Sequence, residues 1–184
     1  DRYATAFPVA YQEDVAPADA IGDIQELEAL PEGAGGVGLQ LHRGEAARKS
    51  LHLRLYRRGD PLAMSDLLPL LENFDLRVLN ERPYRVGGNG ALWIQDLEVT
   101  HAGGRELDPE QIGPRFEQAF HAVRDGRAES DGFNRLVIAA GLDWRQAVVL
   151  RAVCRYLLQT GIPFSQRYME SVLARYTEVA ARLV

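Results

Sequence analysis

Three glycines near the start of the chain, Gly33, Gly35 and Gly38, have the spacing G-x-G-x-x-G of loops that hold the pyrophosphate of a dinucleotide. Such a loop follows a strand and opens a helix, so that the pyrophosphate meets the helix N-terminus. Here the pattern predicts a helix before the glycines and a strand after them, which is the reverse order. We therefore interpret "PEGAGGVG" as a flexible loop and expect no cofactor site in this chain.

Other residues that often do chemistry are spaced for structural roles. The four histidines have no metal-ligand spacing such as H-x-x-x-H, and the single cysteine, Cys154, lies in an apolar helical pattern; they are His42, His52, His101 and His121. Ser65 and Ser165 stand at predicted helix starts, where capping accounts for them. No pair of carboxylates is placed for acid–base catalysis. We expect neither a catalytic residue nor a metal site.

One polar cluster is harder to explain by structure alone. The segment "ESDGFNRLVIAAGLDWRQ", residues 129–146, brings Asp131, Asn134 and Arg135 close to Trp144 and Arg145. Unpaired polar groups in a core cost a few kcal/mol (~1–3). We therefore interpret Asp131, Asn134 and Arg135 as a buried polar joint between domains, with a ligand site as the alternative.

The first half of the chain alternates between helix and strand patterns. Residues 17–30 predict a helix that begins at Pro17 and has an apolar face formed by Ile21, Ile24, Leu27 and Leu30. Two strands follow, in which alternate residues share a face: Val37, Leu39 and Leu41, then Leu51, Leu53 and Leu55. The polar stretch "RGEAARKS" between them is typical of a hairpin loop.

Residues 64–86 predict a helix that passes directly into a strand. Ser65 or Asp66 can cap the helix, and Pro69 then falls near its first turn. Asp75, at the junction, tolerates the left-handed backbone conformation better than most residues do. Pro83 removes a hydrogen-bond donor from the following strand, which favours an edge position. "GGNG", residues 87–90, predicts the turn into a last strand at 92–99.

The unit from 51 to 99 is therefore βαββ, the first part of a ferredoxin-like fold. In that topology the third strand inserts between the first two, and residues 37–43 can pair antiparallel with the first. The prediction is an α+β fold with a four-stranded antiparallel sheet and helices on one face. An all-helical subdomain follows it.

The second half predicts helices that begin at Asp108–Pro109, Asp131, Asp143 and Ser165. Their expected buried stripes are Ile112, Phe116, Ala119, Phe120 and Val123; Phe133, Leu136, Val137 and Ala140; Val149, Val153, Cys154 and Leu157; and Val172, Leu173, Tyr176 and Val179. We expect a first domain over residues 1–105 and a helical segment over 106–184, packed against it.

Bulk composition narrows the function classes. The net charge of −5, with both signs spread along the chain, argues against nucleic acid as a partner. No segment approaches the ~20 apolar residues that a membrane span requires, and a single cysteine favours the reducing cytoplasm. The first residue is Asp1 and the last helical pattern runs to the end, so we expect a piece of a longer polypeptide.

Several segments of the chain resemble the large bacterial NAD-dependent glutamate dehydrogenases. They are "FPVAYQEDVAPADAIGDIQELEAL", "MSDLLPLLENFDLRVLNERPY", "WIQDLEV", "RFEQAFHAVRDGRAESDGFNRL" and "AGLDWRQAVVLRAVCRYLLQTGIPFSQRY". The resemblance covers nearly the whole chain and is most specific from Asp131 to Tyr168. Three positions depart from it: Asp75, where Gly is common, Leu97, where Phe is common, and Arg124, where Trp is common.

This resemblance implies an ACT-like regulatory module and a helical segment upstream of the catalytic domain. The parent chain would oxidatively deaminate L-glutamate to 2-oxoglutarate and ammonia, with NAD bound in its catalytic domain. Glutamate dehydrogenases use lysines and an aspartate in a cleft, whereas Lys49 is the only lysine here. The resemblance thus implies that these 184 residues are noncatalytic and have the rest of the same polypeptide as a partner.

ACT-like sheets commonly join side by side and bind amino acids at the junction, near the loop after the first strand. By position, that implies an amino-acid effector site at Arg58, Gly59, Asp60 and Asp66, and a homo-oligomer formed through ACT-like or helical contacts. The alternative is a purely structural oligomerisation scaffold with no ligand of its own.

Overall fold

A computed structural model describes all residues except 1–2, 4, 33–34, 44–49 and 88–91. The chain forms two compact units. The sheet unit contains Asp1–Met64 and Val78–Thr100, and the helical unit contains Ser65–Arg77 and His101–Val184. The hairpin loop "RGEAARKS", the turn "GGNG" and the first glycine of the G-x-G-x-x-G pattern lie wholly or mostly outside the described residues.

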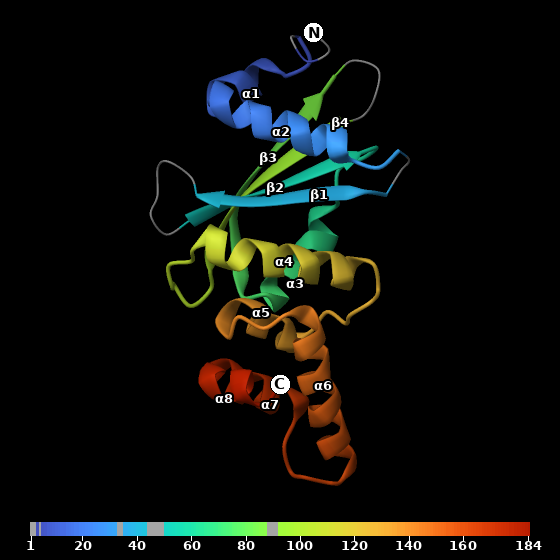
Figure 1. The fold of residues 1–184 in the computed structure, drawn as a ribbon, viewed down its shortest axis with the longest axis vertical. Helices are drawn as coiled ribbons and strands as arrows, with labels where there is room; N and C mark the ends of the chain where they lie inside the picture. Colours follow the sequence, from blue (N-terminus) through green and yellow to red (C-terminus); the bar gives the residue numbers. More distant parts are fainter. Residues whose placement is uncertain (1–2, 4, 33–34, 44–49, 88–91) are drawn as a thin grey trace. The chain divides into compact units, whose positions relative to one another are not determined.

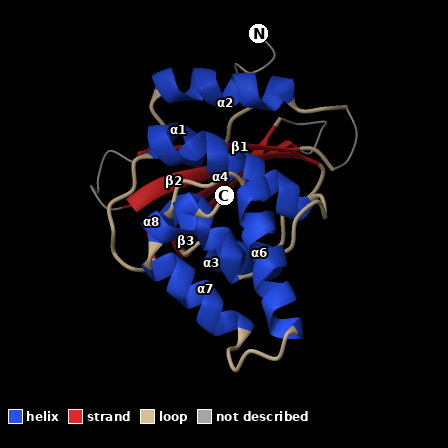
Figure 2. Ribbon diagram, turned by 60° about the horizontal axis from the view of Figure 1, so that its bottom comes forward, coloured by secondary structure: helices blue, strands red, loops and turns tan. Residues whose placement is uncertain are grey.

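Four strands and two helices build most of the sheet unit (Figures 1 and 2). These elements are α1 (Val9–Asp14), α2 (Pro17–Ala29), β1 (Val37–Arg43), β2 (Ser50–Arg58), β3 (Leu76–Val86) and β4 (Leu92–His101). The strand order is β1-β2-β4-β3, and β2 pairs antiparallel with both β1 and β4. The predicted α+β class and antiparallel sheet are confirmed, including the insertion of β4 beside β2.

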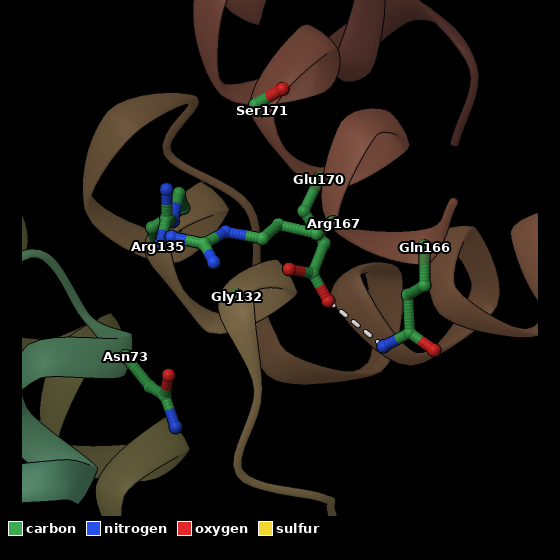
Figure 3. Close-up of a pocket in the computed structure, with 7 residues that line it drawn as sticks. All are labelled: Asn73, Gly132, Arg135, Gln166, Arg167, Glu170 and Ser171. Carbon is green, nitrogen blue, oxygen red and sulfur yellow. Dashed lines mark hydrogen bonds between the residues drawn. The ribbon is translucent and has the colours of Figure 1, made fainter. Parts of the chain in front are cut away.

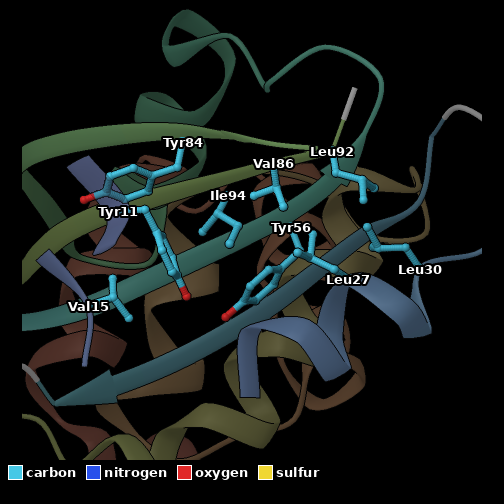
Figure 4. Close-up of a cluster of buried hydrophobic side chains, with 9 residues drawn as sticks. All are labelled: Tyr11, Val15, Leu27, Leu30, Tyr56, Tyr84, Val86, Leu92 and Ile94. Atoms are coloured by element: carbon cyan, nitrogen blue, oxygen red, sulfur yellow. The ribbon is translucent and has the colours of Figure 1, made fainter. Parts of the chain in front are cut away.

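The register of the strands places the leucines on one face of the sheet. Leu39 lies opposite Leu55 and Leu41 opposite Leu53, so the two predicted alternations share a face. The other face carries Tyr56, which packs with α1 and α2 in a core cluster (Figure 4). The members of this cluster are Tyr11, Val15, Leu27, Leu30, Tyr56, Tyr84, Val86, Leu92 and Ile94.

Local backbone chemistry explains how β3 is placed. Asp75 adopts a φ of 64°, the left-handed conformation predicted for the helix-to-strand junction. β3 is an edge strand, as Pro83 required, because an edge leaves one row of backbone groups without a strand partner. Pro69 differs from prediction. The helix before β3 begins at Met64, so Pro69 lies in the interior of this helix and not near its first turn. Ser65 and Asp66 lie within the first turn and not at the cap position.

The helical unit consists of short helices with side-chain caps. Its elements are α3 (Met64–Asn73), α4 (Pro109–Arg124), the 3₁₀ turn η1 (Gly132–Asn134), α5 (Arg135–Ala139), α6 (Trp144–Gln159), α7 (Gln166–Arg175) and α8 (Thr177–Arg182). Asp108, Asp131, Asp143 and Ser165 all accept a hydrogen bond from a backbone N–H at a helix start. Asp143 and Gln146 complete a capping box.

Three predicted helix faces are partly wrong. On α2, Ile21 is exposed, and the buried face is formed by Asp23 and Leu27. On α6, Val149, Val153 and Leu157 are exposed, while Cys154 is buried as predicted; the residues that are buried are Ala147, Leu150, Arg151 and Cys154. Beyond α7, Tyr176 and Val179 are exposed because the helix ends at Arg175 and α8 restarts the pattern. These helices have apolar residues on several sides, so their neighbours decide which side is buried.

Candidate functional site

A buried charge network lies on the α1/α2 face of the sheet. Asp23 of α2 is completely buried and accepts hydrogen bonds from the hydroxyls of Tyr11 and Tyr56, the latter at 2.6 Å. Nη1 of Arg54, on β2, lies 3.0 Å from both carboxylate oxygens of Asp23. A buried carboxylate requires such donors because desolvation of a charge costs several kcal/mol.

The network continues along the sheet through Asp96 to a pair of histidines. Nε of Arg54 lies 3.4 Å from Asp96 Oδ2, and Asp96 Oδ1 lies 2.8 Å from Nδ1 of His52. The ring of His52 stacks on that of His42, with 5.4 Å between centroids. Asp96 lies directly opposite Arg54 in the β2–β4 pair and diagonal to His52, which lies opposite Glu98, while Asp23 is contributed by α2. Five elements, α1, α2, β1, β2 and β4, thus contribute side chains to this network.

The network changes the proton affinity of its members. Burial, together with the neighbouring Asp23 carboxylate, raises the pKa of Tyr11 and Tyr56. The hydrogen bond to Asp96 raises the pKa of His52, whereas burial and the Arg54 charge lower the pKa of His42 to about 4. Burial, the largest single effect, would raise the pKa of Asp96, but the bond to His52 and the charges of His52, Arg54 and His42 together lower it.

A groove of about 370 Å³ opens over this network. Its wall includes the carboxylates of Asp14, Asp19 and Glu98 in addition to Asp96, with Arg82 paired to Asp14 at 2.7 Å. Within the described part of the chain, no three His, Cys, Asp or Glu residues are grouped to hold a metal ion. The hydrogen bonds from Arg54 and Tyr56 to Asp23 link α2 to β2 beneath this groove.

A second buried arginine organises the helical unit. Arg151 of α6 donates to both oxygens of Asp131, at 2.7 Å each, and to the side-chain oxygen of Asn134 at 2.7 Å. It also lies over the ring of Phe133, 5.7 Å from the centroid. Asp131 and Asn134 are therefore joined by Arg151 inside the helical unit. The sequence prediction had not included Arg151.

Arg135, the third residue of the predicted joint, lies elsewhere, in a pocket of about 620 Å³ (Figure 3). The pocket is lined by Asn73, Gly132, Arg135, Gln166, Arg167, Glu170 and Ser171. Nε of Arg135 is buried and has no hydrogen-bond partner. Glu170 accepts a hydrogen bond of 2.8 Å from Gln166, so its carboxylate is already engaged.

The residues predicted for an effector site fall in different units. Arg58, Gly59 and Asp60 follow β2 in the sheet unit, where Gly59 has a φ of 97°, and Asp66 lies in α3 of the helical unit. Neither the groove nor the pocket described above is lined by them. The effector site at these four residues stays a prediction.

Sequence signals for the two networks exist but are weak. Asp23 occupies a position in phase with Ala20, Leu27 and Leu30 on a helix face that is otherwise apolar. Arg54 alternates in phase with His52 and Tyr56 on a strand. A charged residue in the buried phase of an element indicates that a partner from another element must be present.

Family comparisons match almost the whole chain. Residues 36–112 match the ACT3 domain of glutamate dehydrogenase, residues 1–30 match its helical motif 2, and residues 128–184 match its helical motif 3. The ACT3 match covers all four strands and α3, so the family data support an ACT-like domain followed by a helical region.

Individual relatives agree over the same length. The chain is 40% identical to a NAD-specific glutamate dehydrogenase of Halomonas elongata and 41% identical to that of Pseudomonas aeruginosa, with 100% and 99% of this chain covered. The enzyme of Mycobacterium tuberculosis is 37% identical over the full chain. The chain spans only 11–12% of the length of these relatives.

The sheet and its flanking helices define an ACT-like α+β domain combined with glutamate dehydrogenase helical motifs. Over its whole length the chain is similar to a segment of the large NAD-specific glutamate dehydrogenases. None of the helices among the described residues has the length and apolar character needed to cross a membrane.

Proposed function

We propose that this chain is a noncatalytic regulatory and assembly region of a NAD-dependent glutamate dehydrogenase. The complete enzyme would convert L-glutamate to 2-oxoglutarate and ammonia, with NAD bound in a different, catalytic domain. The observation that supports this is the match of the chain to an ACT domain and two helical motifs, which together amount to about a tenth of each relative. A cytoplasmic location belongs to the same proposal, supported by the single free Cys154.

A direct assay separates this proposal from a catalytic role. The 184-residue chain is incubated with L-glutamate and NAD, and NADH formation is followed by absorbance. A full-length dehydrogenase containing the chain serves as the positive control. We expect no turnover by the chain alone and turnover by the full-length enzyme. NADH production by the purified chain would overturn the noncatalytic assignment.

An amino-acid effector is the expected ligand of the regulatory role. The residues proposed to contact it are Arg58, Gly59 and Asp60 after β2, and Asp66 in α3. Isothermal titration of the chain with glutamate, aspartate, arginine and leucine tests this. We expect heat of binding with at least one amino acid, reduced by Asp66→Ala. If all four titrations are silent, effector sensing by this region is excluded.

A purely structural scaffold is the second candidate, and the sheet order favours it in one respect. β1 and β3 are the edge strands, and an edge strand can pair with another copy. Pro83 makes β3 the poorer edge, so β1, Val37–Arg43, is the expected contact for a homo-oligomer. Sedimentation velocity over a range of concentrations tests this, and a monomer throughout would remove β1 pairing as the basis of assembly.

A further inference from the structure

Most arginines of the helical unit that line its surfaces have an oxygen or an aromatic ring as partner. Arg105 donates to the carbonyl oxygen of Ile138 at 2.9 Å, and Arg151 is paired with Asp131. Arg175 lies over the ring of Tyr176. Arg77, Arg115 and Arg182 have no such partner either, so what calls for an explanation is two unpaired arginine side chains that line the same pocket.

Arg135 and Arg167 are such a pair. Both line the pocket of about 620 Å³, and Figure 3 shows the side chain of Arg167 extending toward the guanidinium group of Arg135. Neither side chain makes a hydrogen bond or an ion pair with any residue that the structure describes. Two positive charges that face one pocket repel each other, and a bound anion removes that repulsion.

The acidic residue nearest in sequence does not neutralise them. Glu170 lies three positions after Arg167 on α7, a spacing at which ion pairs form on a helix. Its carboxylate instead accepts from Gln166 and packs against Gly132, where an added Cβ would clash with Glu170 Oε2. Asp131, which also accepts from Gln166, is held by Arg151. Neither acid therefore forms an ion pair with Arg135 or Arg167, although Glu170 lines the same pocket.

The remaining wall suits an oxyanion. Asn73 and Ser171 add an amide and a hydroxyl to the lining. Arginine forks bind carboxylate and phosphate oxygens in pairs, and a volume of this size is within the usual ~300–1,000 Å³ of small-molecule sites. We propose that this pocket binds a small dianion, either a dicarboxylate or a phosphate group, between Arg135 and Arg167.

This site is distinct from the effector residues proposed above, so it succeeds or fails independently of them. The chain is titrated by calorimetry with succinate and with inorganic phosphate, and with acetate as a singly charged control at matched ionic strength. We expect saturable binding of succinate or phosphate, at least tenfold tighter than that of acetate. Which of the two binds more tightly identifies the class of the natural ligand.

Two variants of α7 make the test specific. Arg167→Gln removes an exposed member of the pair and is expected to weaken dianion binding at least tenfold, with Arg167→Lys intermediate because it lacks the fork. Arg175→Gln, on the same helix but outside the pocket, should bind like the parent chain. Circular dichroism confirms that the variants fold.

Two results would overturn the proposal. One is the absence of saturable binding of both succinate and phosphate, or binding that Arg167→Gln leaves unchanged. The other is concentration-dependent self-association that disappears in Arg167→Gln, which would identify the occupant as an acidic side chain of a second copy.

Discussion

Two arginines, one in each unit, are buried to nearly the same extent, but their partners lie at different distances along the sequence. Arg54, 6% exposed, is held by Asp23 of α2 and Asp96 of β4, which lie 31 and 42 residues away. Arg151, 4% exposed, is held by Asp131 and Asn134, only 20 and 17 residues before it. In the sheet unit the guanidinium group of Arg54 is paired with residues distant in sequence. In the helical unit the guanidinium group of Arg151 is paired with residues of the segment just before α6.

The comparison shows why the pocket of Arg135 and Arg167 is unusual. In both units a buried guanidinium is satisfied by carboxylate or amide oxygens, as the cost of desolvation requires. Arg135 keeps a buried Nε without such a partner. Arg57 and Arg58 in the sheet unit also keep a buried Nε without a partner, so what distinguishes Arg135 is the pocket that it shares with Arg167.

The largest expected effect comes from Arg54→Met. It leaves the carboxylate of Asp23, which is completely buried, with only tyrosine hydroxyls as donors, and removes a partner of Asp96. We expect the sheet unit to lose about 3–5 kcal/mol of stability. Hydrogen exchange followed by mass spectrometry measures this on β2 and β4 peptides.

Arg85→Met, on the exposed side of β3, is the control for Arg54→Met. It should change the exchange of those peptides by less than about 0.5 kcal/mol. If both variants exchange alike, the Asp23–Arg54 pair contributes little to holding α2 on the sheet.

A smaller loss is expected for Arg151→Met in the helical unit. Asp131 is less deeply buried than Asp23 and still accepts from the backbone N–H of Phe133, so water and this bond compensate in part. We expect a loss of about 2–3 kcal/mol, from the unpaired Asn134 and Asp131. Hydrogen exchange of α6 peptides, measured over a urea titration, gives this loss of stability.

The matched control is Arg155→Met, one turn further along α6. Arg155 pairs with Glu129 at the surface, where ion pairs contribute about 0–1 kcal/mol. A loss as large as that of Arg151→Met would mean that burial does not distinguish the two pairs, and the comparison of buried networks would fail.

Much of this architecture could be predicted because the signals are local. The caps at Asp108, Asp143 and Ser165 are each fixed by a side chain and a backbone N–H two or three residues away. Pro83 has no backbone N–H to donate to a neighbouring strand, which favours an edge position for β3. The helix α1 was missed because it has only six residues and no side-chain cap.

The networks could not be predicted because their partners are chosen by tertiary structure. Asp23, Arg54 and Asp96 come from three elements, and no spacing rule connects them. In the helical unit, the sequence indicated Asp131 and Asn134 as a polar cluster. It did not indicate their partner Arg151, because nothing in the sequence of α6 distinguishes this buried arginine from a surface arginine. Arg167 gave no signal, since a polar residue at the start of a helix is ordinary.

A third prediction separates the two histidines of the sheet unit. His52 has a raised pKa, so its contribution to stability is present below the unfolded value of about 6.5 and is lost as pH rises through the folded pKa. His42 has a pKa lowered to about 4, so it is neutral in the fold and destabilises progressively as pH falls below about 6.5.

Thermal unfolding from pH 8 to pH 5 should therefore change in opposite directions in two variants. Relative to the parent chain, the melting temperature of His42→Gln should rise as pH falls, and that of His52→Gln should fall. His101 and His121 titrate in all three proteins, so their effects cancel in the differences. Equal slopes in both variants would show that the Asp96 bond does not set the charge of His52.

The smallest expected effect concerns the junction between α3 and β3, and it has the opposite sign. Asp75 holds a φ of 64°, a conformation that costs most L-residues about 1–2 kcal/mol and glycine almost nothing. Asp75→Gly also removes the contact of Asp75 with His101, 3.9 Å away, which is too long to contribute much. We expect the free energy of unfolding to rise by a few tenths to about 1 kcal/mol.

Asp66→Gly, in the first turn of α3, is the control and should instead lower the free energy of unfolding by about 0.5–1 kcal/mol. The reason is that φ is negative there, so glycine only adds backbone entropy to the unfolded chain. Chemical denaturation of both variants gives the two signs, and a loss in Asp75→Gly would mean that the aspartate side chain, rather than the backbone, holds this junction.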